Sequence, residues 1–201
     1  MFKKYVARRF LAEELDCSLI CRIQALLSYD GVKPSSMFPY SGDLELNKIF
    51  EDFGMNAEVK KYRRSPILFI ARDNNYLGLV VNAFENFLKY RCESKGFYRA
   101  SYDMGAVLGY PETAITAYQN QKYFRNKDER KIIKRLMLFF NSREFYNAER
   151  LTALKWEKHI ALHYPKLYLD FFLETYRIRW KDLRYCGEKA FQNFKEKHLG
   201  F

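Results

Sequence analysis

The spacing of apolar residues predicts a chain built mostly of amphipathic helices. Leucine and isoleucine recur every three or four positions over Lys3–Ser28, which predicts one long helix with a single apolar stripe. The basic residues Arg8, Arg9 and Arg22 lie off that stripe. The same periodicity predicts further helices over Tyr76–Arg91, Ser101–Leu108, Lys127–Phe140, Glu149–His163, Leu167–Arg179 and Lys181–Lys197.

The clearest strand signal is the short apolar run Pro66–Ala71, which reads PILFIA. A continuous apolar run of this length is typical of a strand that is buried on both faces. Ala57–Tyr62 alternates weakly and predicts a second strand. Gly31–Gly42 is rich in proline, glycine and serine and predicts a loop, and a short helix through Phe53 is ended by Gly54.

These patterns predict an α+β or α/β fold that is predominantly helical. We expect a small sheet of about two to four strands flanked by helices, with a helical C-terminal third. The sequence contains no internal repeat and no low-complexity linker. We therefore expect a single domain over residues 1–201, with an N-terminal helical subdomain over 1–54 as the alternative.

The stretch Phe97–Gln121 carries the most distinctive local pattern. Gly109 suits a left-handed backbone position that ends a helix, and Pro111 suits the first turn of the next one. The pattern therefore predicts a helix, a sharp Gly-Tyr-Pro corner and a second helix. Such a corner is either the floor of an anion site, because N–H groups are free at a helix start, or a packed turn. Glu112 favours the packed turn, since it would repel an anion.

Several polar residues lie near this corner or directly after the predicted strand. If they converge in one cleft, their carboxylates and hydroxyl provide the groups that an acid–base site needs. The candidate pocket-lining residues are Arg72, Asp73, Asp103, Tyr110 and Glu112.

Charge is distributed unevenly along the chain. The formal net charge is +11, but residues 1–58 carry 7 basic and 9 acidic side chains, whereas residues 59–201 carry 28 and 15. A positive field in one part of a chain favours an anionic partner, and basic residues interleaved with aromatics favour nucleic acid. The alternative is a solvated helix face. The candidate contacts are Lys122, Arg125, Lys127, Arg130, Lys131, Lys134, Arg177, Arg179, Lys181 and Arg184.

The pattern of cysteine and histidine predicts neither a metal nor a cofactor. Four cysteines occur, but none forms a Cys-x-x-Cys pair, and we expect free thiols in a reducing, cytoplasmic protein. His159 and His163 lie one helical turn apart, as a metal pair would, but no third ligand accompanies them. No phosphate-binding loop, dinucleotide fingerprint or nucleophile elbow is present.

The N-terminus is basic and amphipathic, but its apolar run is broken by acidic residues, so we do not expect a secretory signal. No stretch approaches the roughly 20 apolar residues of a membrane span.

The order strand, Arg-Asp, helix, Gly-x-x-Leu-Gly-Tyr-Pro resembles an uncharacterised prokaryotic family that carries a Leu-Gly-Tyr-Pro-x-Cys-Cys motif. The resemblance covers about residues 66–170 and rests on Arg72, Asp73, Gly105 and the run 108–111, with His163 and Pro165 as weaker matches. The family's cysteine pair is replaced here by Thr113 and Ala114. The resemblance therefore implies a retained scaffold whose cysteine site is lost, which favours a non-enzymatic or altered role.

Three functions follow as hypotheses. The first is a non-enzymatic protein that binds an anionic partner, with nucleic acid as the best candidate, through a basic surface in 122–197. The second is an enzyme with a pocket around the Gly-Tyr-Pro corner. The third is a structural protein that forms oligomers through exposed aromatic side chains, because 18% of the residues are aromatic.

Overall fold

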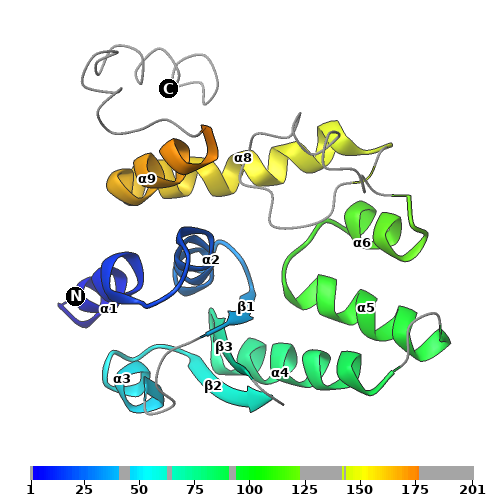
Figure 1. The fold of residues 1–201 in the computed structure, drawn as a ribbon, viewed down its shortest axis with the longest axis horizontal. Coiled ribbons are helices and arrows are strands. Elements are labelled where there is room, and N and C mark those ends of the chain that lie inside the picture. The colour runs from blue at the N-terminus through cyan, green and yellow to red at the C-terminus, as the bar shows by residue number, and fades with distance from the viewer. Residues whose placement is uncertain are drawn as a thin grey trace.

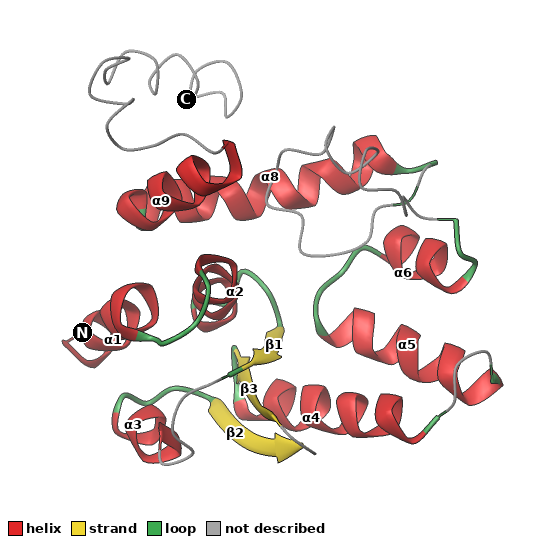
Figure 2. Ribbon diagram, viewed as in Figure 1, coloured by secondary structure: helices red, strands yellow, loops and turns green. Residues whose placement is uncertain are grey.

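The computed structural model describes residues 2–40, 46–62, 65–90, 94–122, 142 and 144–176. Over these ranges the chain is mostly helical (Figures 1 and 2). The described elements, in chain order, are α1 Phe2–Arg9, the π-helical turn η1 Phe10–Glu14, α2 Leu19–Tyr29, β1 Ser35–Pro39, α3 Leu46–Asp52, β2 Ala57–Tyr62, β3 Ser65–Ala71, α4 Asn74–Lys89, α5 Lys95–Val107, α6 Glu112–Gln119, α8 Tyr146–His163 and α9 Pro165–Tyr176.

The described strands form one small sheet of order β1-β3-β2. Both pairings are antiparallel, with Phe38 opposite Leu68 in one and Val59 opposite Leu68 in the other. The predicted class, predominantly helical with a small sheet, is confirmed. The antiparallel pairing makes it α+β.

The central strand β3 is apolar from Pro66 to Ala71 because both of its faces are covered over that run. Leu68 and Ile70 pack into a core with α2, α3 and α8, while Phe69 packs on the other face with Val80 and Phe84 of α4. The predicted strand and the helix that follows it are therefore both central to the core.

The predicted loop over Gly31–Gly42 is wrong for its middle part, which forms the edge strand β1. Serine usually competes with regular structure, but here both serine hydroxyls of β1 bond to neighbouring helices. Ser35 Oγ donates to Val107 O (2.6 Å) and Ser36 Oγ donates to Gln24 O (2.9 Å). Pro39 is tolerated because it ends an edge strand.

The single helix predicted over Lys3–Ser28 is also wrong, because the chain breaks between η1 and α2. The backbone is extended at Leu15 (ψ 118°) and at Ser18 (ψ 157°). The Arg22 side chain bonds the carbonyls that the break exposes, with Nε 2.9 Å from Leu15 O. The apolar stripe continues across the break because both pieces face the same core.

The predicted Gly-Tyr-Pro corner is present between α5 and α6. Gly109 has φ +72°, and the N–H groups of Gly109 and Tyr110 bond to Ala106 O and Gly105 O, each at 3.0 Å. This pair of hydrogen bonds is the Schellman motif that ends a helix. Pro111 is the N-cap residue of α6, whereas the prediction placed it one position further into the helix, in the first turn.

Helices α8 and α9 pack on α2, whereas α4 packs on the sheet, α5 on α4 and α6 on α5 (Figure 1). One core cluster includes residues from Ala7 in α1 to Tyr168 in α9. Helix α8 ends at His163, as predicted. Helix α9 begins at Pro165, two positions earlier than predicted. Among the described helices, none is long and apolar enough to cross a membrane.

Candidate functional site

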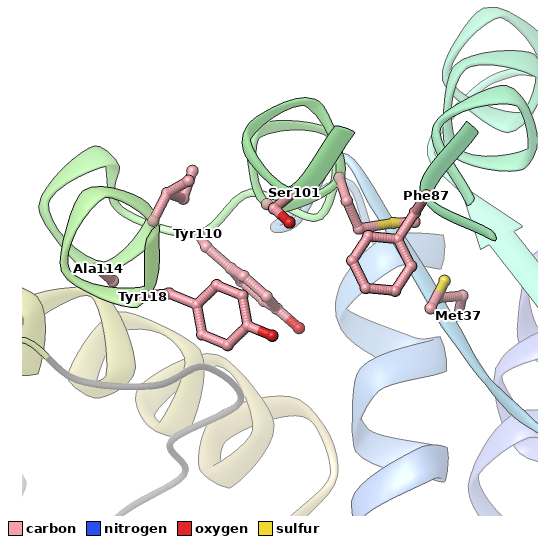
Figure 3. A pocket seen from close by; sticks show the side chains of 9 residues that line it. Met37, Phe87, Ser101, Tyr110, Ala114 and Tyr118 are labelled. Carbon is pink, nitrogen blue, oxygen red and sulfur yellow. The ribbon is translucent and has the colours of Figure 1, made fainter. Parts of the chain in front are cut away.

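A cavity of about 190 Å³ lies beside the Gly-Tyr-Pro corner. It opens between β1, α4, α5 and α6. In Figure 3 the rings of Tyr110 and Tyr118 lie on one side of it, and Phe87 and Met37 on the other. Its lining residues are Met37, Phe87, Ser101, Met104, Gly105, Tyr110, Ala114, Ile115 and Tyr118. None of these described lining residues is charged.

Of the five predicted pocket residues, only Tyr110 lines this cavity. Burial raises the pKa of Tyr110 to about 12, so its hydroxyl stays protonated at neutral pH. Arg72 and Asp73 pair with each other (3.3 Å), and Asp73 caps α4 by accepting from Tyr76 N (2.9 Å). The Arg72 guanidinium lies 3.8 Å from the centre of the Tyr76 ring.

The remaining two predicted pocket residues are bound at other places. Asp103 pairs with Arg99 one turn before it on α5 (3.2 Å). Glu112 accepts from the Tyr102 hydroxyl (3.2 Å) and raises the pKa of that hydroxyl by its negative charge. The five groups therefore do not meet in one catalytic cleft.

The predicted nucleic-acid contacts fall almost entirely outside the described residues. The exception is Lys122, which is exposed and lines a hollow of about 630 Å³ together with Glu112 and the residues before α8. The nine that lie outside the described ranges are Arg125, Lys127, Arg130, Lys131, Lys134, Arg177, Arg179, Lys181 and Arg184.

A different, basic-lined cleft of about 590 Å³ lies between the N-terminal helices and the corner that joins α8 to α9. Its lining includes two carboxylates, Glu13 and Asp170, against several basic side chains. The basic residues that line it are Arg8, Arg9, Arg22, His163 and Lys166.

The edge of this cleft is organised by Asp30, a carboxylate whose side chain is only 2% exposed. Its Oδ1 accepts from Arg8 Nε (2.9 Å), with Arg8 Nη2 2.8 Å away. Its Oδ2 lies 2.8 Å from His159 Nε2 and 2.7 Å from the Tyr164 hydroxyl. Side chains from α1, from α8 and from the α8–α9 corner thus converge on one carboxylate at the end of α2.

The charges of this cluster reinforce one another. Burial alone would raise the pKa of Asp30, but the hydrogen bonds from His159, Tyr164 and Arg8 outweigh it, and the net pKa is lowered. Burial would likewise lower the pKa of Arg8, but the bond to Asp30 outweighs it and the pKa is raised. Asp30 is therefore an ionised acceptor and His159 Nε2 acts as a donor to it.

The basic side chains of the cleft are unequally available to a ligand. The Arg22 guanidinium already donates to backbone carbonyls, and Arg9 Nε lies 3.5 Å from Glu13 Oε2. Arg8 is held by Asp30 but keeps 44% of its side chain exposed. Lys166 is exposed and forms no ion pair among the described residues.

Lys33 is buried between this cleft and the corner, with 1% of its surface exposed. Its Nζ lies 5.5 Å from the Tyr110 ring centre and 5.2 Å from that of Trp156, and 3.4 Å from Ser36 Oγ. No carboxylate pairs with it among the described residues. Burial lowers its pKa to about 7, and the two ring faces are the main groups that offset the cost of its charge.

Sequence reasoning missed the role of the segment between α2 and β1, which contacts both the basic cleft and the Gly-Tyr-Pro corner. Asp30 binds Arg8 at the edge of the cleft, and Lys33 lies against the Tyr110 ring. Pro34 Cδ lies 2.5 Å from the position that a Cβ on Gly109 would take. In the sequence this segment reads only as a glycine- and proline-containing loop. Its Asp-Gly step signals a turn, and nothing local indicates its distant partners.

The predicted absence of a metal site remains a prediction. The rings of His159 and His163 lie 4.5 Å apart, but His159 Nε2 is bonded to Asp30. Within the ranges that the structure describes, no three His, Cys, Asp or Glu residues are grouped so as to hold a metal. Of the cysteines, Cys17 and Cys21 are described, and both are free thiols.

Comparison of the chain with family models, with curated proteins and with solved structures finds no match. The geometry of the cleft and of the cavity is therefore the basis for the proposals that follow.

Proposed function

We propose that the protein binds an anionic partner, with nucleic acid as the first candidate, at the cleft between α1, α2 and the α8–α9 corner. Four arginine and lysine side chains and His163 line that cleft against two carboxylates. Guanidinium and ammonium groups bind phosphate through charge-assisted hydrogen bonds.

The observation that supports this most is the fixed position of Arg8. A free arginine side chain loses much conformational entropy when it binds a ligand, but Asp30 already orders this guanidinium. His159 and Tyr164 occupy the second oxygen of Asp30, so the carboxylate is fixed too. The exposed edge of Arg8 is thereby preorganised for a phosphate oxygen.

The sequence around α8 and α9 supports the same partner. Residues 123–141 precede α8 and residues 177–201 follow α9, and together they contain 13 basic and 5 acidic side chains. A long polyanion makes use of such a charge distribution, whereas a small anion requires only the cleft itself. We therefore propose a nucleic-acid strand as the first ligand to test and a small phosphate compound as the second.

The test is a titration of fluorescently labelled single-stranded RNA and duplex DNA, followed by anisotropy at low and at physiological salt. We expect binding that weakens steeply with salt, and we expect Lys166→Glu to reduce both the affinity and the salt slope. Lys61→Glu is the matched control, since Lys61 is an exposed lysine of β2 outside the cleft.

Two results contradict the proposal. If neither nucleic acid binds at low salt, the partner is not a nucleic acid. If Lys166→Glu and Lys61→Glu weaken binding equally, the attraction comes from net charge and not from the cleft.

A second candidate is self-association, supported by apolar side chains on the surface of α8. Leu151 and Leu162 are 60% and 66% exposed and are separated by about three helical turns, so they lie on one face. Size-exclusion chromatography at two concentrations tests it, and an unchanged elution volume at the monomer position contradicts it.

A cytoplasmic location is part of the proposal, because the free thiols Cys17 and Cys21 suit a reducing compartment.

A further inference from the structure

The cavity beside the Gly-Tyr-Pro corner is chemically unlike the basic cleft. It is lined by residues of β1, α4, α5, α6 and the corner itself, and the cleft shares none of them. Any ligand here must therefore differ in chemistry from an anionic partner, and its binding is independent of the proposed function.

The size of the cavity limits the ligand to one or two small rings. Its volume is about 190 Å³. A dry protein cavity of roughly 150 Å³ admits a benzene molecule. A single ring with one small substituent or a compact bicycle such as indole therefore fits inside it, whereas a larger polycyclic compound or a long acyl chain is not enclosed.

The walls favour an aromatic ring over a saturated one. The rings of Tyr110 and Tyr118 face Phe87 and Met37 across the cavity (Figure 3). Aromatic rings gain from offset or edge contacts with other rings, and thioether sulfur also contacts ring edges favourably. Met104 adds a second thioether to the lining.

Ser101 provides the polar contact in the wall. Its hydroxyl is buried and donates to Phe97 O at 2.8 Å, which leaves the Oγ lone pairs as acceptors. A ligand with one O–H or N–H donor satisfies this acceptor. Because none of the described residues that line the cavity is charged, an ionised ligand would lose its hydration without a charged partner among them.

We propose that this cavity binds a small, neutral, planar aromatic molecule that carries one hydrogen-bond donor, with the ring between Tyr110, Tyr118 and Phe87 and the donor on Ser101 Oγ. Phenol and indole are the probes that represent this class.

The experiment compares four compounds on the intact protein by isothermal titration and by two-dimensional NMR. Phenol and indole have a ring and a donor, toluene has the ring alone, and cyclohexanol has the donor on a saturated ring. We expect phenol and indole to bind about five- to tenfold more tightly than toluene, since one hydrogen bond contributes that much. Equal binding of cyclohexanol and phenol overturns the aromatic class, and no binding by any probe overturns the site.

Two variants locate the binding. Ala114→Leu fills the cavity and should abolish phenol binding, while Ala106→Leu places the same side chain at an exposed position of α5 and should not. Ser101→Ala should lower the affinity for phenol to the affinity for toluene. If Ala114→Leu does not fold, the Ser101→Ala comparison decides. Unchanged phenol binding in Ser101→Ala, or in a folded Ala114→Leu, overturns the proposal.

Discussion

The basic cleft and the corner cavity are built in opposite ways, although the same short segment between α2 and β1 contacts both. The cleft depends on one buried carboxylate and its donors, which come from elements far apart in the chain. The cavity depends on apolar side chains set around a local turn. One is held by electrostatics and the other by packing.

This difference explains why the two regions should respond differently to substitution. Donors that surround a buried carboxylate must all be present, because each unsatisfied group retains its desolvation cost. A cavity wall tolerates the loss of one contact more easily, but a tight turn does not tolerate an added atom. The following substitutions separate these effects, from the largest to the smallest.

The largest effect is expected for Asp30→Ala. The substitution leaves Arg8, His159 and Tyr164 without their shared acceptor. Because Arg8 stays partly exposed, the cost is below that of a fully buried ion pair, about 3 kcal/mol. We expect that loss in the free energy of unfolding, measured by urea denaturation at neutral pH. Phenol binding to the corner cavity should persist in the folded fraction, because Asp30 is not part of its wall.

Asp103→Ala is the control for this prediction. Asp103 also pairs with an arginine, but that pair is exposed, and exposed pairs contribute about 0–1 kcal/mol. If the two substitutions destabilise the protein equally, Asp30 does not organise the cleft in the way described.

The second effect concerns Lys33, which lies between the two regions. Its pKa is lowered to about 7 from 10.5, so the unfolded chain binds more protons than the folded one between these values. The free energy of unfolding should therefore rise as pH increases from 7 towards 10, by an amount on the order of a few kcal/mol. Above pH 10 the raised pKa of Tyr110, about 12, acts in the opposite direction.

Lys33→Met should remove this pH dependence. A thioether fills a similar volume without a charge, and Ser36 keeps its bonds to Ser28 and Gln24. We expect a variant that is more stable than the parent near pH 7 and equal to it near pH 10, measured by thermal melts across that range. Parallel stability curves for the two proteins would show that Lys33 does not carry a buried charge.

The third effect is expected for Gly109→Ala at the corner. Gly109 has φ +72°, and an added Cβ would lie 2.5 Å from Pro34 Cδ. The left-handed conformation costs about 1–2 kcal/mol for a residue with a Cβ, and the contact with Pro34 adds to it. We expect a loss of about 2–3 kcal/mol in unfolding free energy.

Gly31→Ala separates the two contributions. Gly31 has φ +75° but no atom within 4 Å of its added Cβ, so only the backbone cost applies. Equal losses at the two glycines would mean that Pro34 yields freely and that the corner is not packed tightly against the segment before β1.

The same contrast defines what the sequence could predict. The corner was predicted because Gly109 and Pro111 lie within a few residues of the helices that they end and begin. The strand β3 was predicted from its own composition. The Asp30 cluster was not predicted, because its partners lie 22, 129 and 134 residues away. Sequence separation of that size leaves no periodic or local signal.

The two wrong element predictions have local causes that only tertiary contacts reveal. The serines of β1 suggest a turn until Val107 and Gln24 supply acceptors for them. The break before α2 is hidden because Leu15 and Leu19 keep helical spacing across it, and Arg22 stabilises it by binding the carbonyl of Leu15. The expected basic contacts in 123–141 and 177–201 lie outside the described residues and stay predictions.

The smallest effect is expected for Asp73→Ala, a residue that the sequence placed in the wall of the corner pocket. In the structure its Oδ1 accepts from Tyr76 N and caps α4, and its Oδ2 pairs with the exposed Arg72. Loss of such a cap costs about 1 kcal/mol. Ser94→Ala, which removes the equivalent cap of α5, should cost about the same. Both should be measured by urea denaturation together with phenol titration. Because Asp73 does not line the cavity, a loss of phenol affinity in Asp73→Ala alone would show that the first turn of α4 belongs to the site.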